Sequence, residues 1–336
     1  MNAKDKHRVS PLVLVVDNAL AVTGGINAVR HATGPLHKQY GLRFAYILPL
    51  GSKARAILEA DGYPVYELPF VEISRSKTNL LRYVPYLLRN GWMLYRLARR
   101  EGATIIHAND FYNLAGYVAK LMSLGKLQVI THVRFLPQSL PQPLARTWRW
   151  LASVLANRIV CVSHAVGAYF KDVANARVIY DPLPGQEHHP ATSYLPHSTD
   201  TIRFLYLASY IQGKGQDLAL QAFRQAYAQD RRLRLHYVGG DMGLAKNQAF
   251  RQKLEEEVAE YNLAKIVTFE GFATDVEAAI KAADVVLNFS ESESFSLTCL
   301  DALYYGTALI ASDCGGPAEL FEHDRSGLLV PNRDVA

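Results

Sequence analysis

Cysteine is scarce in this chain, and the three that occur lie in apolar or glycine-rich runs. Cys161, Cys299 and Cys314 lack the paired spacing of a zinc site or a redox motif, so we predict three buried thiols. Long hydrophobic runs are also missing, because no stretch reaches about 18 uncharged apolar residues. No apolar signal segment follows the charged start, residues 1–10. These absences predict a soluble, cytoplasmic protein.

Two motifs are missing as well, and each absence argues against a class of chemistry. No G-x-G-x-x-G pattern follows the first expected strand, which argues against an NAD-dependent oxidoreductase. No Asp-x-Asp pair occurs among the aspartates, so a Mg²⁺ or Mn²⁺ ion lacks an obvious pair of carboxylate ligands. We therefore expect neither a metal ion nor a bound cofactor.

The composition is that of an ordinary globular protein, with 49% hydrophobic and 20% charged residues and enough length for two domains. The charge is unevenly distributed. Residues 1–200 hold 23 Lys and Arg against 12 Asp and Glu, whereas the remainder holds 13 against 19. This asymmetry indicates different partners for the two halves. The basic half contains no recognisable nucleic-acid-binding module, so we expect no nucleic acid partner.

Short β-rich apolar runs alternate with longer helical patterns, which is typical of βα units around a parallel sheet. The expected strands are residues 12–16, 44–48, 104–108, 127–131, 159–162 and 178–180 in the first half, and 204–207, 233–238, 266–269, 285–288, 308–311 and 328–330 in the second. We predict an α/β fold with two Rossmann-like domains, residues 1–185 and 201–336. The proline-rich, polar segment between them, residues 186–200, is the expected linker.

Residues 288–319 form the richest segment and read as a strand, a polar turn, a helix, a strand and a glycine-rich turn. The residues 295–305 have helical spacing, and Ser294 or Ser296 can cap this helix, whose exposed backbone amides would attract an anion such as a pyrophosphate. Glu293 and Asp301 lie about two helical turns apart, so one can meet a sugar and the other a ribose. The same carboxylates could instead stabilise the helix dipole or face solvent.

This segment resembles the retaining GT-B glycosyltransferases of family four, whose hallmark is a Glu, seven residues and a second Glu. Here the pattern runs from Glu293 to Asp301, which is one methylene shorter at the second position. The family's Gly-Gly-x-x-Glu turn and Gly-Leu-Leu-Val-Pro strand follow as residues 315–319 and 327–331. The resemblance implies a GT-B fold in which the parallel sheets of two Rossmann-like domains face a central cleft. It also implies further helices after the last strand, which this sequence lacks.

The resemblance assigns a donor-binding role to the second domain and to one loop of the first. The family places an Arg and a Lys on the donor phosphates, and here Lys214 fills the Lys position while Ser209 stands at the Arg position. Without the resemblance, Lys214 would be read as a solvated loop lysine. The donor-side residues are Gly24, Gly25, Ser209, Lys214, Ser294, Phe295, Ser296, Leu297, Asp301, Gly315, Gly316 and Glu319.

Gly24 and Gly25 follow the first expected strand, where glycine lets a backbone approach a phosphate or sugar, or merely forms the turn into a helix. The family's first loop contacts phosphate through this pair. His132 ends the strand at residues 127–131 and matches a Thr-His motif whose His faces the donor sugar. By itself, a histidine at a strand end is more often a satisfied structural group.

A second loop of the first domain resembles the family's His-x-His-Asp loop, with Asn109 at the position of the second His. It would place His107 and Asp110 on the acceptor side, although both could equally cap the next helix. Arg134, two residues after His132, could steady an anionic group nearby.

Together these matches imply a metal-independent, retaining transfer of a sugar from a nucleotide-diphosphate sugar to a glycan or lipid-linked acceptor, in cell-surface polysaccharide or glycolipid synthesis. Lys214 and the helix start at Ser296 would stabilise the leaving group. Glu293 would hold the sugar, and His132 would position it from the other domain. Two alternatives keep the fold: a non-catalytic relative that binds a nucleotide or a protein, and a nucleotide-sugar epimerase or phosphorylase.

Basic residues punctuate a helical pattern over residues 75–100 that also carries several leucines and aromatic residues. The basic residues are Arg75, Lys77, Arg82, Arg89, Arg96, Arg99 and Arg100. Such a helix can rest on anionic lipid and hold the protein peripherally at the inner face of a membrane, near a lipid-linked acceptor. A core-facing stripe with a solvated basic face explains the same pattern.

Overall fold

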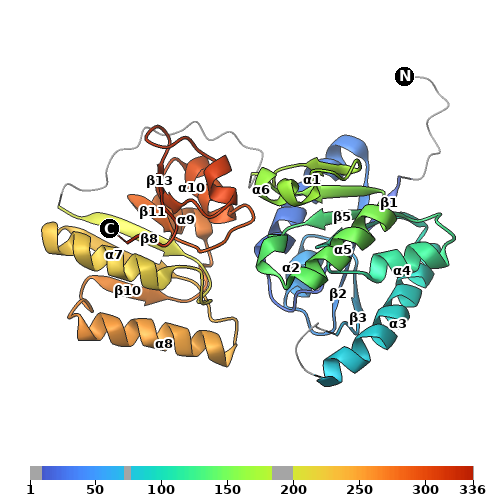
Figure 1. The fold of residues 1–336 in the computed structure, drawn as a ribbon, viewed down its shortest axis with the longest axis horizontal. Coiled ribbons are helices and arrows are strands. Elements are labelled where there is room, and N and C mark those ends of the chain that lie inside the picture. Colours follow the sequence, from blue (N-terminus) through green and yellow to red (C-terminus); the bar gives the residue numbers. More distant parts are fainter. Residues whose placement is uncertain (1–9, 72–76, 184–199, 336) are drawn as a thin grey trace. The chain divides into compact units, whose positions relative to one another are not determined.

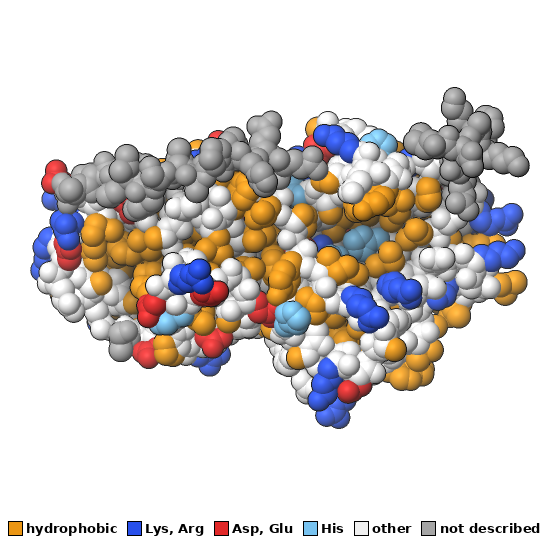
Figure 2. Space-filling view, turned by 90° about the horizontal axis from the view of Figure 1, so that it is seen from above, with side chains coloured by type: hydrophobic (Ala, Val, Ile, Leu, Met, Phe, Trp, Pro, Cys, Tyr) orange, Lys and Arg blue, Asp and Glu red, His pale blue; other side chains and the backbone are white. Residues whose placement is uncertain are grey.

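The chain folds into two compact units, Met1–Pro182 and Leu183–Ala336. The computed structural model describes residues 10–71, 77–183 and 200–335, and each unit is built around one parallel sheet (Figure 1). Residues 186–199 of the expected linker lie outside the described residues. On the face drawn in Figure 2, acidic side chains are more frequent on the second unit than on the basic first unit, in line with the sequence.

The described part of the first unit contains a seven-stranded sheet. Its strands are β1 (Leu12–Val16), β2 (Arg43–Pro49), β3 (Val65–Leu68), β4 (Ala103–Asn109), β5 (Gln128–Val133), β6 (Arg158–Cys161) and β7 (Ala176–Val178). Their spatial order is β3-β2-β1-β4-β5-β6-β7. The helices are α1 (Gly24–Tyr40), α2 (Ala54–Ala60), α3 (Lys77–Glu101), α4 (Ala115–Met122), α5 (Gln142–Leu155) and the short α6 (His164–Gly167).

The second unit repeats the plan with a six-stranded sheet in its described residues. Its strands are β8 (Ile202–Leu207), β9 (Leu233–Val238), β10 (Val267–Glu270), β11 (Val285–Asn288), β12 (Ala308–Ser312) and β13 (Leu328–Val330). Their order is β10-β9-β8-β11-β12-β13. The helices are α7 (Gln216–Gln229), α8 (Ala245–Glu260), α9 (Val276–Lys281) and α10 (Leu297–Tyr305).

Apolar runs became strands because parallel strands are covered on both faces. All five residues of β1, Leu-Val-Leu-Val-Val, are buried between β2 and β4. In the second unit, separate apolar clusters cover the two faces of the sheet. One contains Tyr206, Tyr237 and residues of α7 and α8, and the other contains Leu205, Val286 and residues of α9 and α10.

The expected α/β fold is confirmed, with two differences in the first sheet. β3 was not predicted, because this four-residue edge strand is only partly buried and contains Glu67. β7 ends at Val178 rather than at Tyr180, since Ile179 and Tyr180 are exposed after the strand. The three cysteines are free and buried, as predicted, and burial raises the pKa of Cys161 and Cys299 to about 12.

The strand order identifies where each unit can bind a ligand. In the first sheet the order reverses between β1 and β4, and in the second between β8 and β11. Open parallel sheets bind ligands beyond the carboxyl ends of the strands at such switch points. The loops that follow β1, β4, β8 and β11 are therefore the places to look for a site.

Candidate active site

The first loop of the first unit leads from β1 into α1. The Thr23 hydroxyl caps this helix by accepting a hydrogen bond from the Ile26 amide at 3.3 Å, and Gly24 and Gly25 are its first two residues. A methyl group at Gly25 would lie 3.2 Å from Cδ of Arg134. The loop therefore packs closely on the polar groups beyond β5 because position 25 carries no side chain. Contact of either glycine with a phosphate stays a prediction.

Four polar side chains meet beyond the carboxyl ends of β1, β4 and β5. Nη1 of Arg134 donates to both carboxylate oxygens of Asp181 at 2.6 and 2.7 Å, and its Nε donates to Oδ1 of Asn109 at 2.5 Å. Nδ2 of Asn109 donates in turn to Asp17 at 2.5 Å. The side chains of Arg134 and Asp181 are only 9% and 7% exposed. Their neighbours thus hold Arg134 in one geometry within the unit.

His107 and His132 lie beside this network as a stacked pair. Their ring centroids are 5.3 Å apart, and Nε2 of His107 lies 3.2 Å from Nδ1 of His132. Burial and the charge of Arg134 lower the pKa of His107 to about 3. Burial, followed by Arg134 and His107, lowers the pKa of His132 well below its usual value. Both imidazoles are therefore neutral at neutral pH.

Asp110 occupies a strained backbone position directly after β4. Its φ of 143° is unusual for a residue with a side chain, and its Oδ1 accepts the Phe111 amide at 2.8 Å. Burial raises the pKa of Asp110 to about 7. The alternative that this loop caps the next helix is wrong, because α4 begins after Leu114 without a side-chain cap. The acceptor-side role of His107, Asp110 and Arg134 stays a prediction.

In the second unit, Lys214 and Glu293 form an ion pair between the loops that follow β8 and β11. Nζ of Lys214 lies 2.6 Å from Oε1 of Glu293, and the side chains are 33% and 15% exposed. Ser290, which sequence reasoning did not select, donates its hydroxyl to the same Oε1 at 2.8 Å. Tyr206 joins the two loops, because its hydroxyl donates to the Lys214 carbonyl at 2.5 Å and accepts the Phe289 amide at 2.8 Å.

Two glycines allow these loops to approach one another. Gly215 has a φ of 81°, and a methyl group there would lie 2.0 Å from the carbonyl oxygen of Phe289. At Gly316 a methyl group would lie 2.3 Å from Cα of Phe295. The Gly315–Gly316 turn is thereby packed against the segment before α10, where Glu293 pairs with Gly315 in a parallel bridge.

α10 begins at Leu297, two residues later than expected, with Ser296 as its cap. The Ser296 hydroxyl accepts the Cys299 amide at 3.3 Å and a hydrogen bond from Nδ2 of Asn288 at 2.9 Å. Phe295 is buried instead of starting the helix. The first amides of a helix have no partner within it, so those of Leu297 and Thr298 are suited to an anion.

The other predicted donor-side residues lie around the same loops. Ser209 follows β8, and its carbonyl accepts a hydrogen bond from Gln216 at 2.9 Å. Ser294 precedes the helix cap, and Glu319 ends the short 3₁₀ helix Gly316–Glu319. Asp301 lies in the second turn of α10, whereas Glu293 lies in the bridge before the helix, so the two carboxylates do not share one helix.

We expect Asp301 to make the stability of the second unit depend on pH. Burial raises the pKa of Asp301 to about 6, whereas the pKa of an unfolded aspartate is about 3.9. Between these two pKa values, the Asp301 carboxyl is ionised in the unfolded chain but still protonated in the folded one. The free energy of unfolding therefore falls as pH rises from about 4 to 6 and stays reduced above pH 6. D301N should therefore raise the free energy of unfolding by up to about 3 kcal/mol at pH 7 and by little at pH 4. Urea denaturation at both pH values measures this, with the exposed Asp313→Asn as control. An equal gain at both pH values would contradict the assignment.

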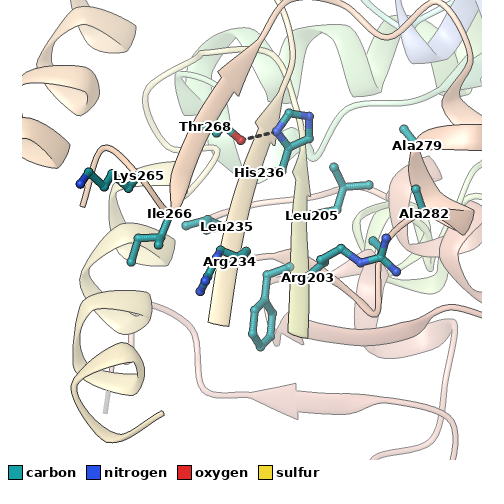
Figure 3. Close-up of a pocket in the computed structure, with 12 residues that line it drawn as sticks. Arg203, Leu205, Arg234, Leu235, His236, Lys265, Ile266, Thr268, Ala279 and Ala282 are labelled. Atoms are coloured by element: carbon teal, nitrogen blue, oxygen red, sulfur yellow. Dashed lines mark hydrogen bonds between the residues drawn. The ribbon is translucent and has the colours of Figure 1, made fainter. Parts of the chain in front are cut away.

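A cavity of about 360 Å³ lies at the opposite edge of the second sheet (Figure 3). Arg203, Arg234 and His236 line it near the amino ends of β8 and β9. The two arginines point in different directions, and Arg203 pairs with Asp284 at 3.2 Å. The cavity therefore lacks a point on which its charges converge. Within the described ranges, no group of three or more His, Cys, Asp or Glu could hold a metal ion.

Comparisons with known proteins match both units. The family described as "Glycosyl transferases group 1" matches residues 194–336, and "Glycosyltransferase Family 4" matches residues 54–183. D-inositol 3-phosphate glycosyltransferase from Frankia alni is 34% identical over 258 residues, which cover 74% of this chain and 61% of that protein. Human alpha-1,3/1,6-mannosyltransferase is 28% identical over 193 residues, which cover 52% of this chain and 46% of that protein.

Among solved structures, HepE from Anabaena in complex with UDP and glucose superposes with a TM-score of 0.77 at 19% identity. The match covers 96% of this chain and 86% of HepE. Two parallel α/β units and this likeness define the GT-B fold. With a family match in each unit, the chain belongs to the family 4, group 1 glycosyltransferases. It spans less than two thirds of the length of the two curated relatives named above.

Proposed function

We propose that this protein transfers a sugar from a nucleotide-diphosphate sugar to a glycan or lipid-linked acceptor, with retention at the anomeric carbon and without a metal ion. The observation that carries the proposal is the Lys214–Glu293 pair, 2.6 Å apart beside the capped start of α10. It combines a cation, a carboxylate and helix amides at one sheet edge. Those groups suit a sugar diphosphate, whose phosphates are anionic and whose hydroxyls seek hydrogen bonds.

In the proposed mechanism, one set of groups binds the leaving diphosphate and another set binds the sugar. Lys214 and the first amides of α10 would stabilise charge that develops on the departing diphosphate, where preorganised donors are most effective. Glu293 would accept hydrogen bonds from hydroxyls of the sugar. Ser290 and Lys214 both contact Oε1 of Glu293, and these contacts help to orient the carboxylate. His132 would hydrogen-bond to a hydroxyl group of a sugar.

Nucleotide binding tests the donor site. We expect calorimetry with UDP, GDP and ADP to show selective binding of one of them, weakened about tenfold or more by Lys214→Ala because a charge-assisted phosphate contact is lost. UDP is titrated first, since HepE was solved with it. Lys253→Ala serves as the control, because Lys253 is exposed on α8. If no nucleotide binds, the donor site is absent and a non-catalytic relative, which Ser209 at the Arg position also suggests, becomes the better description.

Two further measurements test the finer parts of the proposal. Titrations in EDTA and in Mg²⁺ should give the same affinity if no metal bridges the phosphates. NMR of the first-formed product should show the anomeric configuration of the donor if the transfer is retaining. An inverted product would leave the family assignment in place but remove the proposed stereochemistry.

We propose that α3 binds a membrane surface, where a lipid-linked acceptor would be found. Its buried face includes Gly91, which touches Val118 of α4 closely, and Leu94. The preceding turns of the helix expose an apolar stripe at helical spacing, with Leu81 80%, Val84 57%, Leu88 50% and Trp92 46% exposed. Arg82 and Arg96 lie over the rings of Tyr86 and Trp92. Exposed apolar side chains flanked by arginines match an anionic lipid interface better than a merely solvated basic face does. Arg75 lies outside the described residues, and in the described ranges no helix has the length and apolarity needed to span a bilayer.

Vesicle cosedimentation tests this surface. We expect the protein to bind vesicles that contain anionic lipid, more weakly at high salt, and the double variant L88S/W92S to bind about tenfold or more weakly because two apolar side chains no longer insert. Trp150→Ser is the matched control, since Trp150 is 62% exposed on α5. Absence of salt-sensitive binding would end the proposal, and an equal loss with the control would place the contact elsewhere.

A further inference from the structure

Arg134 makes several polar contacts at the carboxyl edge of the first sheet. Its Nη1 pairs with Asp181, its Nε donates to Asn109, and its Nη2 lies 3.1 Å from Nδ1 of His132. Asn109 is oriented by its own bond to Asp17. The guanidinium therefore reaches His132 from a fixed position.

The contact with Arg134 decides which nitrogen of His132 carries the proton. A guanidinium can only donate, so Nδ1 of His132 accepts. In a neutral imidazole that accepts through Nδ1, the hydrogen is on Nε2. Nε2 of His107 lies 3.2 Å from the same Nδ1, but that nitrogen has one lone pair, which the charged guanidinium of Arg134 occupies. Burial and the nearby charge lower the pKa of His132, which keeps the ring neutral.

The other nitrogen of His132, Nε2, is buried and lacks a hydrogen-bond partner in the described residues. With Nδ1 accepting, this atom is an N–H donor whose burial without an acceptor is costly. A hydroxyl oxygen of a bound sugar is a suitable acceptor.

We propose that Arg134, held by Asp181, is a positioning residue that keeps His132 in the Nε2–H tautomer, so that His132 donates a hydrogen bond to a hydroxyl oxygen of a bound sugar. The proposal rests on the proposed function for the identity of the ligand. It gives Arg134 a role through His132, in place of direct contact with an anion. Asp181, two residues before the start of the second unit, would then act by holding the Arg134 guanidinium.

NMR of protein labelled with ¹⁵N-histidine tests the tautomer without any turnover. His132→Gln identifies the His132 signals by their loss. In the unmodified protein at pH 7 we expect Nδ1 of His132 to resonate as a bare imidazole nitrogen and Nε2 as a protonated one. Arg134→Met should shift both signals toward a mixture of tautomers, and Asp181→Asn should do so in part. His107→Gln should leave the tautomer unchanged, because Arg134 still donates.

Kinetics then connect the tautomer with transfer. Arg134→Met should lower kcat about tenfold or more, as a misplaced imidazole proton does in other enzymes, while the affinity for free nucleotide stays unchanged. If Arg134→Met does not fold, the tautomer of the unmodified protein and the response of Asp181→Asn decide. An Nδ1–H tautomer in the unmodified protein, or no shift in Arg134→Met, overturns the inference. The expected tautomer in a protein that binds no nucleotide would instead overturn the proposed function.

Discussion

Replacing Glu293 with Gln should lower sugar transfer by about 100-fold or more, because the carboxylate proposed to accept hydrogen bonds from the reacting sugar is lost. The substitution keeps the side-chain shape, and Ser290 can still donate to the amide oxygen. Nucleotide affinity should stay the same or rise, since Lys214 no longer pairs with a carboxylate. The measurement is turnover of the nucleotide sugar that calorimetry selects, together with the dissociation constant of its nucleotide.

Two results with Glu293→Gln would contradict the proposed role of Glu293 in different ways. A full transfer rate in Glu293→Gln would remove Glu293 from the mechanism. A parallel fall in turnover and nucleotide affinity would mean that Glu293 acts only by orienting Lys214. Glu277→Gln is the control, because Glu277 pairs with a lysine on the same helix, α9, and is exposed.

Gly215→Ala should be the most destabilising single change among the loop glycines. The new methyl group would lie 2.0 Å from the Phe289 carbonyl oxygen and 2.9 Å from the Tyr206 hydroxyl, at a φ of 81°. The positive φ costs about 1–2 kcal/mol, and forcing atoms into a packed site costs about 1–3 kcal/mol more. The free energy of unfolding of the second unit should therefore fall by about 2–5 kcal/mol.

Gly213→Ala separates the two costs. Its φ is 89°, but a methyl group there would come no closer than 3.8 Å to the Glu291 carboxylate, so only the backbone cost applies. All three tryptophans, Trp92, Trp148 and Trp150, lie in the first unit. Tryptophan fluorescence should thus stay unchanged while calorimetry and circular dichroism report the loss in the second unit. Equal destabilisation by both variants would mean that the approach to Phe289 costs nothing.

Much of the fold could be predicted because parallel strands covered on both faces require continuous apolar runs. β1, β9 and β11 have the bounds expected from their hydrophobic pattern alone. β3 was not predicted, because an edge strand is half exposed and does not need a continuous apolar run. The pattern of residues 295–305 predicted a helix, but burial of Phe295 delays its start to Leu297.

Some residues of the candidate site could likewise be predicted from the sequence, and others could not. Lys214, Glu293 and the Gly315–Gly316 turn could be selected because they belong to local motifs at loops that follow strands. Ser290 and Tyr206 could not, since a serine in a polar turn and a tyrosine within a strand look ordinary until the loops meet. Asp181 gave no signal either, because its partner Arg134 lies 47 positions earlier in the chain.

The sequence by itself determined the two parallel α/β units, the family and the loops that form the candidate site, since apolar periodicity and local motifs are properties of neighbouring residues. Only the tertiary structure decided which polar atoms meet. The ion pair of Lys214 with Glu293, 79 positions apart, and the contacts that fix the His132 ring exist because parallel strands bring their carboxyl ends to one edge. Hydrogen-bond direction and burial depend on that arrangement in space, which no local pattern encodes.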